Sequence, residues 1–218
     1  MRLFFDLLYN EFAWAYDWVS RTVSLGQWRA WQRAGLRRLR GRRVLEIAHG
    51  TGDMLLDLAA LGFQPTGLDL SRAMGRQARR KLRAHGLALP LARGRVQALP
   101  FADGAFSSLL ATFPTEFLVD PAALAEFRRV LQPGGVLVAV PVAQLAGPGW
   151  LDRAAAWLFR VTGQASTAWF APFLERYAQA GFAARLEQVT LPAEGGGGPR
   201  SLVTVVIAEK PWPPLTVA

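Results

Sequence analysis

Short strand-like runs and stretches of helical periodicity alternate along the middle of the chain. The runs that predict strands are, in order, Val44–Ala48, Pro65–Asp69, Arg95–Ala98, Phe106–Thr112 and Val136–Val140. The segments that predict helices lie near Asp53–Leu61, from the N-cap residue Ser71 to about His85, and over Pro121–Leu131, which has proline in its first turn. Strands that alternate with helices in this way indicate a mostly parallel sheet with helices on both faces.

Both ends of the chain add elements to this alternating core. Residues 1–40 predict N-terminal helices with a wide aromatic face, and residues 150–180 predict one or two further helices rich in tryptophan and phenylalanine. Two last strands, near Ala184–Thr190 and Leu202–Ala208, predict an antiparallel hairpin at the sheet edge. The fold class is therefore α/β, with a seven-stranded sheet whose last two strands are antiparallel.

The end of the first predicted strand carries the most informative pattern. Val44–Ala48 leads into a loop of small residues, and a helix follows from Asp53. Such a loop presents backbone amides at the carboxyl edge of the sheet, where open α/β folds bind ligands. The Gly-x-Gly-x-x-Gly spacing of dinucleotide sites is not met, because Ala48 stands at its first position and Leu55 at its last. The loop therefore predicts a ligand site of another kind.

The segment Val44–Asp53 resembles motif I of the class I S-adenosylmethionine-dependent methyltransferases, in which an acidic residue precedes a glycine-rich loop. Three later segments resemble further motifs of this family in the family's order: Gly67–Ser71, Ala98–Phe106 and Glu126–Gly135. The chain is most similar to the UbiE/Coq5-like (type 11) group, also through Tyr16-Asp17, Ser24–Gly26 and Trp28. The resemblance implies a Rossmann-like sheet and methyl transfer from S-adenosylmethionine, with S-adenosylhomocysteine as product and no metal.

The resemblance also implies how the chain is organised. Residues 1–218 would form a single methyltransferase domain. Its parts would be a helical N-terminal cap (1–40), the cofactor-binding core (41–142), a helical insertion that covers the substrate (143–180) and the final strands (181–210). The expected acceptor is a small, apolar, quinone-like or lipid-like molecule, because the founding members of the group methylate quinone precursors at carbon.

The same resemblance assigns cofactor contacts residue by residue. Asp69 would accept hydrogen bonds from the ribose diol, Thr51 would contact the methionine end, and Tyr16 would close over the cofactor. The full expected set is Tyr16, Glu46, Ala48, His49, Gly50, Thr51, Gly52, Asp69, Leu70, Arg95, Val96, Gln97, Ala98, Thr112 and Phe113. The alternative interpretation of the glycines is a tight turn selected only for its backbone conformation.

Three positions depart from the family pattern. Ala48 replaces the first glycine of the loop, Arg95 replaces an acid or amide that contacts adenine, and Ser107 replaces an aspartate. These departures leave open a second interpretation, a degenerate protein that keeps the fold as a binding module without catalysis.

Two side chains are candidate proton acceptors. His49 lies in the glycine loop, and imidazole titrates near neutral pH. Glu116 follows the fourth predicted strand, where the methyl acceptor approaches in this family. The alternatives are a histidine that fills space beside the cofactor and a solvated loop acid.

Composition excludes several kinds of chemistry. The chain has no cysteine, which removes disulfides, thiolate nucleophiles and cysteine-ligated zinc, and its two histidines make a histidine-rich metal site a poor prospect. No targeting segment stands out, so we expect a cytoplasmic protein. The sequence does not indicate an oligomeric state.

The net charge of +9 favours an RNA methyltransferase as a third interpretation. The Asn/Asp-Pro-Pro-aromatic motif of many nucleic-acid methylases is absent, however, and Thr112-Phe113-Pro114 stands in its place. The arginines cluster at 37–43 and on the helix after Asp69, outside the expected acceptor loops. The charge is therefore only weak evidence for a nucleic-acid partner, which we do not expect, and it is compatible with peripheral contact with an anionic membrane.

Overall fold

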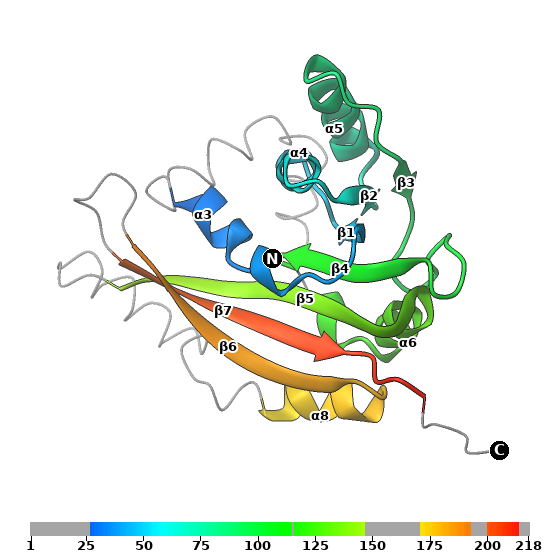
Figure 1. Ribbon diagram of the computed structural model, residues 1–218, viewed down its shortest axis with the longest axis vertical. Coiled ribbons are helices and arrows are strands. Elements are labelled where there is room, and N and C mark those ends of the chain that lie inside the picture. The colour runs from blue at the N-terminus through cyan, green and yellow to red at the C-terminus, as the bar shows by residue number, and fades with distance from the viewer. Residues whose placement is uncertain (1–26, 115, 147–170, 193–199, 214–218) are drawn as a thin grey trace.

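The computed structural model describes residues 27–114, 116–146, 171–192 and 200–213 (Figure 1). The described strands form one seven-stranded sheet in the order β3-β2-β1-β4-β5-β7-β6. Their bounds are β1 Arg43–Ile47, β2 Gln64–Asp69, β3 Leu91–Arg93, β4 Phe106–Thr112, β5 Leu131–Ala146, β6 Ala183–Leu191 and β7 Arg200–Glu209. Strands β1 to β5 pair in parallel, and β7 is antiparallel to both β5 and β6. The predicted α/β class, mostly parallel sheet and antiparallel final hairpin are confirmed.

The order of the strands alone indicates where a ligand-binding site lies. β1 lies between β2 and β4, so the chain crosses over the sheet at this position. The carboxyl ends of these three parallel strands open at one edge. Ligands of open α/β sheets bind in the crevice at such a crossover point.

The hydrophobic core has two halves, one on each face of the sheet. Alternate side chains of β1 point to opposite faces and so contribute to both halves. Leu45 and Ile47 belong to a buried cluster that includes residues of α6 and α8, whereas Val44 belongs to a cluster that includes residues of α3 and α4. The helices that carry these clusters are α3 Trp28–Arg33, α4 Asp53–Ala60, α6 Pro121–Val130 and α8 Ala171–Gln179. The expectation that helices cover both faces is confirmed.

Local capping explains where two helices begin. The Ser71 hydroxyl accepts a hydrogen bond from the Met74 amide at 3.3 Å and starts α5, Arg72–Ala84, as predicted. The Asp120 carboxylate accepts one from the Ala122 amide at 2.9 Å at the start of α6. The short 3-10 helices are η1 Leu36–Arg38 and η2 Glu116–Val119.

The prediction of a third strand at Arg95–Ala98 is wrong. The strand is Leu91–Arg93, and it pairs in parallel with Gly67–Asp69. The Gly94 amide makes the last hydrogen bond of this edge, to the Asp69 carbonyl at 3.2 Å. Because β2 ends at Asp69, the residues after Gly94 have no strand beside them and form a turn.

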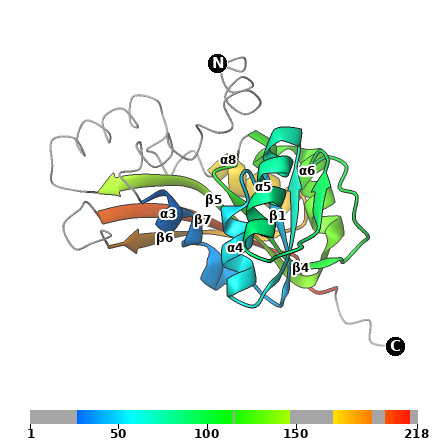
Figure 2. The ribbon, with the colours of Figure 1, turned by 90° about the horizontal axis from the view of Figure 1, so that it is seen from above.

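Strand β5 is longer than the predicted Val136–Val140. It continues to Ala146 and pairs there with the start of β7, so the predicted insertion boundary at residue 143 falls inside a strand. Figure 2 shows these ends of β5, β7 and β6 running past the helix-covered part of the sheet. Of the helical regions predicted at 1–40 and 150–180, the parts at 1–26, which include Tyr16, and at 150–170 lie outside the described residues.

A separate finding concerns membranes. Among the described helices, none combines the length and the apolar character that crossing a membrane requires.

Candidate functional site

The loop after β1 is held in a left-handed backbone conformation at three positions. The φ angles of Ala48, Gly50 and Gly52 are 55°, 55° and 87°. Glycine adopts this region readily, whereas a residue with a Cβ does so at a cost of roughly 1–2 kcal/mol. Ala48, at the position where the family has its first glycine, therefore strains the loop, and its side chain is exposed at the open edge of the sheet.

The two glycines of the loop serve different purposes. A Cβ at Gly50 would meet nothing within 4 Å, so this glycine leaves open space above the loop. A Cβ at Gly52 would lie 2.9 Å from the Cβ of Ala78 on α5. Gly52 thus allows the loop to approach the helix, while Gly50 lets a ligand approach the backbone.

Asp69 stands at the end of β2, opposite this loop. Its carboxylate accepts a hydrogen bond from the Gly50 amide at 2.9 Å and another, on its other oxygen, from the Ser71 amide at 2.7 Å. Each carboxylate oxygen offers about two acceptor positions, so both oxygens keep one for a ligand. The next residue, Leu70, is 55% exposed and presents an apolar surface beside this acid.

Glu46 lies beneath the site within β1. The residue is only 2% exposed, and one of its carboxyl oxygens is buried without a hydrogen-bond partner. Burial, followed by the negative charge of Asp69 and Asp53, raises the pKa of Glu46 well above its ordinary value of 4.5. Burial and the neighbouring acids therefore favour the protonated form of this carboxyl.

His49 points into the protein rather than out of the open edge. It is 4% exposed, and its ring lies so close to β2 that a Cβ on Gly67 would be 2.8 Å from its Cδ2 atom. Its Nδ1 lies 2.9 Å from the Gly50 carbonyl, which requires Nδ1 to donate, and Nε2 is buried without a partner. Burial lowers the pKa of His49 despite the opposing charge of Asp69. This position favours a packing histidine over a proton acceptor.

A charged network fixes the start of α4. The Asp53 carboxylate accepts hydrogen bonds from the Lys81 ammonium at 2.7 Å and the Thr51 hydroxyl at 2.9 Å, and Lys81 also bonds Thr51 at 3.2 Å. Arg29 of α3 pairs with Asp53 and with Asp57, both at 2.7 Å. Burial, the largest single effect, raises the pKa of Asp53, but the bonds from Lys81 and Thr51 and the charge of Arg29 together lower it.

Lys81 and Arg29, which form part of this network, are not among the site residues predicted from the sequence. One signal for Lys81 was present, because it lies three residues after Ala78 and so on the same face of α5, the face that meets Gly52. Arg29 gave no such signal.

Aromatic side chains line the end of β4, next to the loop. Phe113 has a left-handed φ of 49° and donates its amide to the Val140 carbonyl at 2.8 Å. Its ring stacks on Trp28 of α3 with centroids 4.1 Å apart. The neighbouring Thr112 hydroxyl accepts a hydrogen bond from Gln32 at 3.3 Å. Because β2, β1 and β4 are parallel neighbours, Thr112 and Phe113 lie at the same edge of the sheet as Asp69.

The segment expected to contact adenine lies in the turn after β3. Arg95, Gln97 and Ala98 are exposed there, and Val96 is partly buried. The Gln97 amide donates to the Asp120 carboxylate at 2.7 Å, which directs it toward the start of α6. The backbone of Glu116 begins η2, and its side chain lies outside the described part of the structure.

Metal ligands do not gather in the described ranges: no group of three or more histidine or acidic side chains is arranged there to hold an ion. The residues at the carboxyl edge instead fit a polar organic ligand. An anchored carboxylate, an open glycine and an exposed leucine lie around one opening.

Residues 44–135 match the family model described as a methyltransferase domain. The chain is 37% identical over 137 residues to a demethylmenaquinone methyltransferase of Thermus thermophilus, covering 60% of this chain and 62% of that protein. It is 32% identical to a ubiquinone/menaquinone biosynthesis C-methyltransferase UbiE of Geotalea uraniireducens, covering 59% of this chain and 58% of that protein. The chain thus spans about three-fifths of the length of these relatives.

Among solved structures, a SAM-dependent methyltransferase of Methanosarcina mazei superposes with a TM-score of 0.59 at 21% identity, covering 82% of this chain and 97% of that one. This likeness establishes the shared fold.

Proposed function

We propose that this chain, whose residues 44–135 form a methyltransferase domain, transfers the methyl group of S-adenosylmethionine to a small, apolar, quinone-like acceptor. One observation carries the proposal: the Asp69 carboxylate is anchored by the Gly50 amide beneath an opening that glycine leaves free. Hydroxyl pairs on a ribose are suitable partners for the acceptor positions that remain on this carboxylate.

Different residues at the carboxyl edge of the sheet would bind different parts of the cofactor. Asp69 would accept the ribose hydroxyls, Leu70 would cover one face of the adenine, and the backbone of the glycine loop would lie along the methionine portion. The Thr51 hydroxyl accepts a hydrogen bond from Lys81, and Thr51 would hold the start of α4 beside the methionine portion of the cofactor. The cofactor supplies an already activated methyl group when it is bound.

The protein therefore needs to align the acceptor and exclude water. The Trp28–Phe113 pair supplies an aromatic wall beside the cofactor edge, suited to stack against a planar ring. The buried His49 is assigned a packing role, and Glu116 remains the candidate proton acceptor on the loop after β4. The names of the two relatives, which refer to quinone biosynthesis, support an acceptor of this chemistry.

The first test is calorimetric titration with S-adenosylhomocysteine. We expect Asp69→Asn to weaken binding by tenfold or more, because the amide cannot accept the same set of hydrogen bonds. Glu175→Gln, which neutralises an exposed carboxyl on α8, should leave the affinity unchanged. The absence of binding at millimolar ligand, or equal losses in both variants, would contradict the proposal.

The second test identifies the acceptor class. Methyl-labelled S-adenosylmethionine is incubated with the protein and either a reduced demethylated naphthoquinone or total RNA. Label in the quinol supports the proposal, and label in the RNA supports the nucleic-acid alternative. Cofactor binding without transfer to either supports a binding module.

A further inference from the structure

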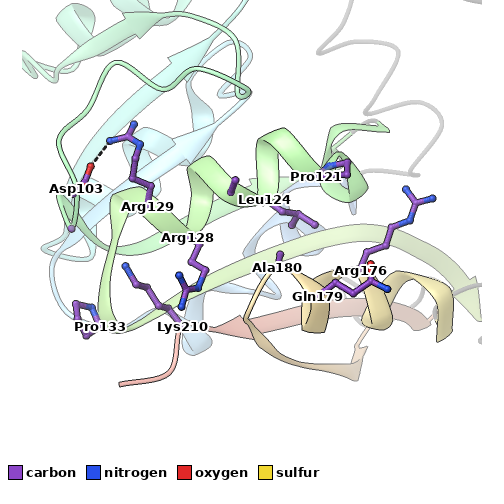
Figure 3. Close-up of a pocket in the computed structure, with 12 residues that line it drawn as sticks. Asp103, Pro121, Leu124, Arg128, Arg129, Pro133, Arg176, Gln179, Ala180 and Lys210 are labelled. Atoms are coloured by element: carbon purple, nitrogen blue, oxygen red, sulfur yellow. Dashed lines mark hydrogen bonds and ion pairs between the residues drawn. The ribbon is translucent and has the colours of Figure 1, made fainter. Parts of the chain in front are cut away.

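A groove lies between α6 and α8 (Figure 3). Its volume is about 1020 Å³, at the upper end of the range for small-molecule sites, ~300–1,000 Å³. Leu124 and Ala125 of α6 and Ala180 after α8 form apolar walls. None of its lining residues belongs to the expected cofactor set, so the groove requires its own explanation.

The charge of the groove is strongly positive. Arg128, Arg176 and Lys210 line it, and none of the three has a carboxylate within ion-pair distance among the described residues. The acid that lines the groove, Asp103, is already paired with Arg129 at 2.8 Å. Arg129 is satisfied further by Glu126, at 2.6 Å. Within the described residues, three cations that make no ion pair therefore line one cavity, with Asp103 as its acidic residue.

Each of these cations is anchored by a backbone carbonyl. The Lys210 ammonium donates to Leu131 at 2.6 Å, Arg176 donates to Val119 at 3.1 Å, and Arg128 donates to Gly181 at 3.4 Å. These bonds use one donor on each side chain, so the ammonium keeps two N–H groups and each guanidinium keeps four. The remaining donors are held at the groove and available to a ligand.

Arg128 and Lys210 lie at the same end of the groove, where β5 begins (Figure 3). Burial, and then the positive charge of Arg128, lower the pKa of Lys210, although the negative charge of Asp103 opposes them. Arg128 lies directly against the chain after α8, since a Cβ on Gly181 would be 2.8 Å from its Nε atom. Two like charges are therefore held near each other, and an anion between them would relieve their repulsion.

We propose that this groove binds a small molecule that carries a phosphate or diphosphate group. Arg128 and Lys210 contact the anionic group, and the guanidinium supplies the forked donors that phosphate oxygens accept. Leu124, Ala125 and Ala180 cover the apolar remainder of the ligand, with Arg176 at the far end. This site is separate from the methyl-transfer edge and does not depend on the function proposed there.

The experiment is calorimetric titration of the full chain with pyrophosphate at low ionic strength. We expect one site per chain, and at least a tenfold loss of affinity in Arg128→Gln and in Lys210→Gln. Arg80→Gln removes the same charge from an exposed position on α5 and should keep the affinity within twofold. No binding by the unaltered chain, or an equal loss in the control, would overturn the proposal.

A second pair of variants tests the groove without removing its anchors. Ala125 is exposed on α6 and lines the cavity. Ala125→Glu brings a negative charge into the groove and should abolish binding, whereas the isosteric Ala125→Gln should retain most of it. Equal affinities in these two variants would place the anion elsewhere.

Two further arms identify the source of the phosphate and the location of the site. Saturating S-adenosylhomocysteine should leave pyrophosphate affinity unchanged, and competition would assign the anion to the glycine loop instead. Flotation with vesicles of phosphatidylcholine and phosphatidate should show no capture that depends on Arg128. Vesicle capture without pyrophosphate binding would overturn the small-molecule assignment in favour of a lipid surface.

Discussion

Trp28 and Phe113 stack with their ring centroids 4.1 Å apart and their planes inclined by 19°. The two residues come from the first described helix and from the end of β4, so the stack fastens α3 to the edge of the sheet. Phe113 keeps this position in a left-handed conformation that most residues avoid. Strain of this kind persists where the surroundings enforce it, often at binding sites.

Trp28→Leu should separate acceptor binding from cofactor binding. The substitution keeps an apolar side chain and removes a stack worth about 1 kcal/mol. We expect the KM for a quinone acceptor to rise several-fold while the Kd for S-adenosylhomocysteine stays constant. Trp212→Leu, at a position that is 73% exposed, is the matched control. A parallel change in both constants would show that the stack supports the fold alone.

Replacing Ala48 with a smaller residue and with a larger one should have opposite effects on the loop. Ala48→Gly removes the strain of the left-handed φ and opens the loop, so S-adenosylhomocysteine should bind several-fold more tightly. Ala48→Val places a branched side chain in the same conformation and should destabilise the fold by about 1–2 kcal/mol. Urea unfolding and calorimetry measure the two effects. Tighter binding by the valine variant would exclude this account.

The contribution of Glu46 to the free energy of unfolding should decrease as the pH rises. Its folded-state pKa lies above its ordinary value of 4.5, so the folded chain holds the proton more tightly than the unfolded chain does. The stabilisation is complete below pH 4.5 and is lost as the pH rises through the raised folded-state pKa. The slope is at most about 1.4 kcal/mol per pH unit.

The comparison of Glu46→Gln with the unaltered chain isolates this contribution. The variant should gain stability relative to the unaltered chain between pH 5 and pH 8, as measured by urea unfolding at each pH. Glu175→Gln, at an exposed position, should show a constant difference over the same range. A constant difference for Glu46→Gln as well would mean that its carboxyl is not buried in the folded state.

Lys81 and Asp53 should be energetically coupled. Both side chains are partly exposed, at 26% and 30%, which limits a pair of this kind to about 1 kcal/mol or less. A double-mutant cycle with Lys81→Gln and Asp53→Asn should give a positive coupling energy. Lys81→Gln should also weaken S-adenosylhomocysteine binding several-fold through Thr51, whereas Arg80→Gln should not. Additive effects would show that the network does not act as a unit.

Sequence patterns predict those elements of this fold whose cause is local. The apolar run before Ala48 and the cap at Ser71 each contain the information that forms them, and both appear as predicted. The third strand was misplaced because its position depends on where β2 ends, at Asp69. A strand boundary set by a neighbouring strand is not encoded in its own residues.

The candidate site also combines features set by local sequence with features set by distant segments. The spacing of the loop and of Asp69 follows from the strand-helix-strand unit, so sequence could locate both. The orientation of His49 depends on the space above Gly67, and two partners of Asp53, Arg29 and Lys81, come from other helices. These contacts arise only when distant segments pack together.

The two sides of the sheet end in different ways. β3 offers a neighbouring chain only three residues of backbone, because its pairing stops with β2. β6 is much longer, but it carries Arg185 and Glu187, which pair with each other at 3.4 Å and bring charge to that border. A strand from another molecule would have little backbone to pair with at β3 and would meet charged side chains at β6. A short edge strand and charged edge residues are both features by which proteins avoid edge-to-edge aggregation.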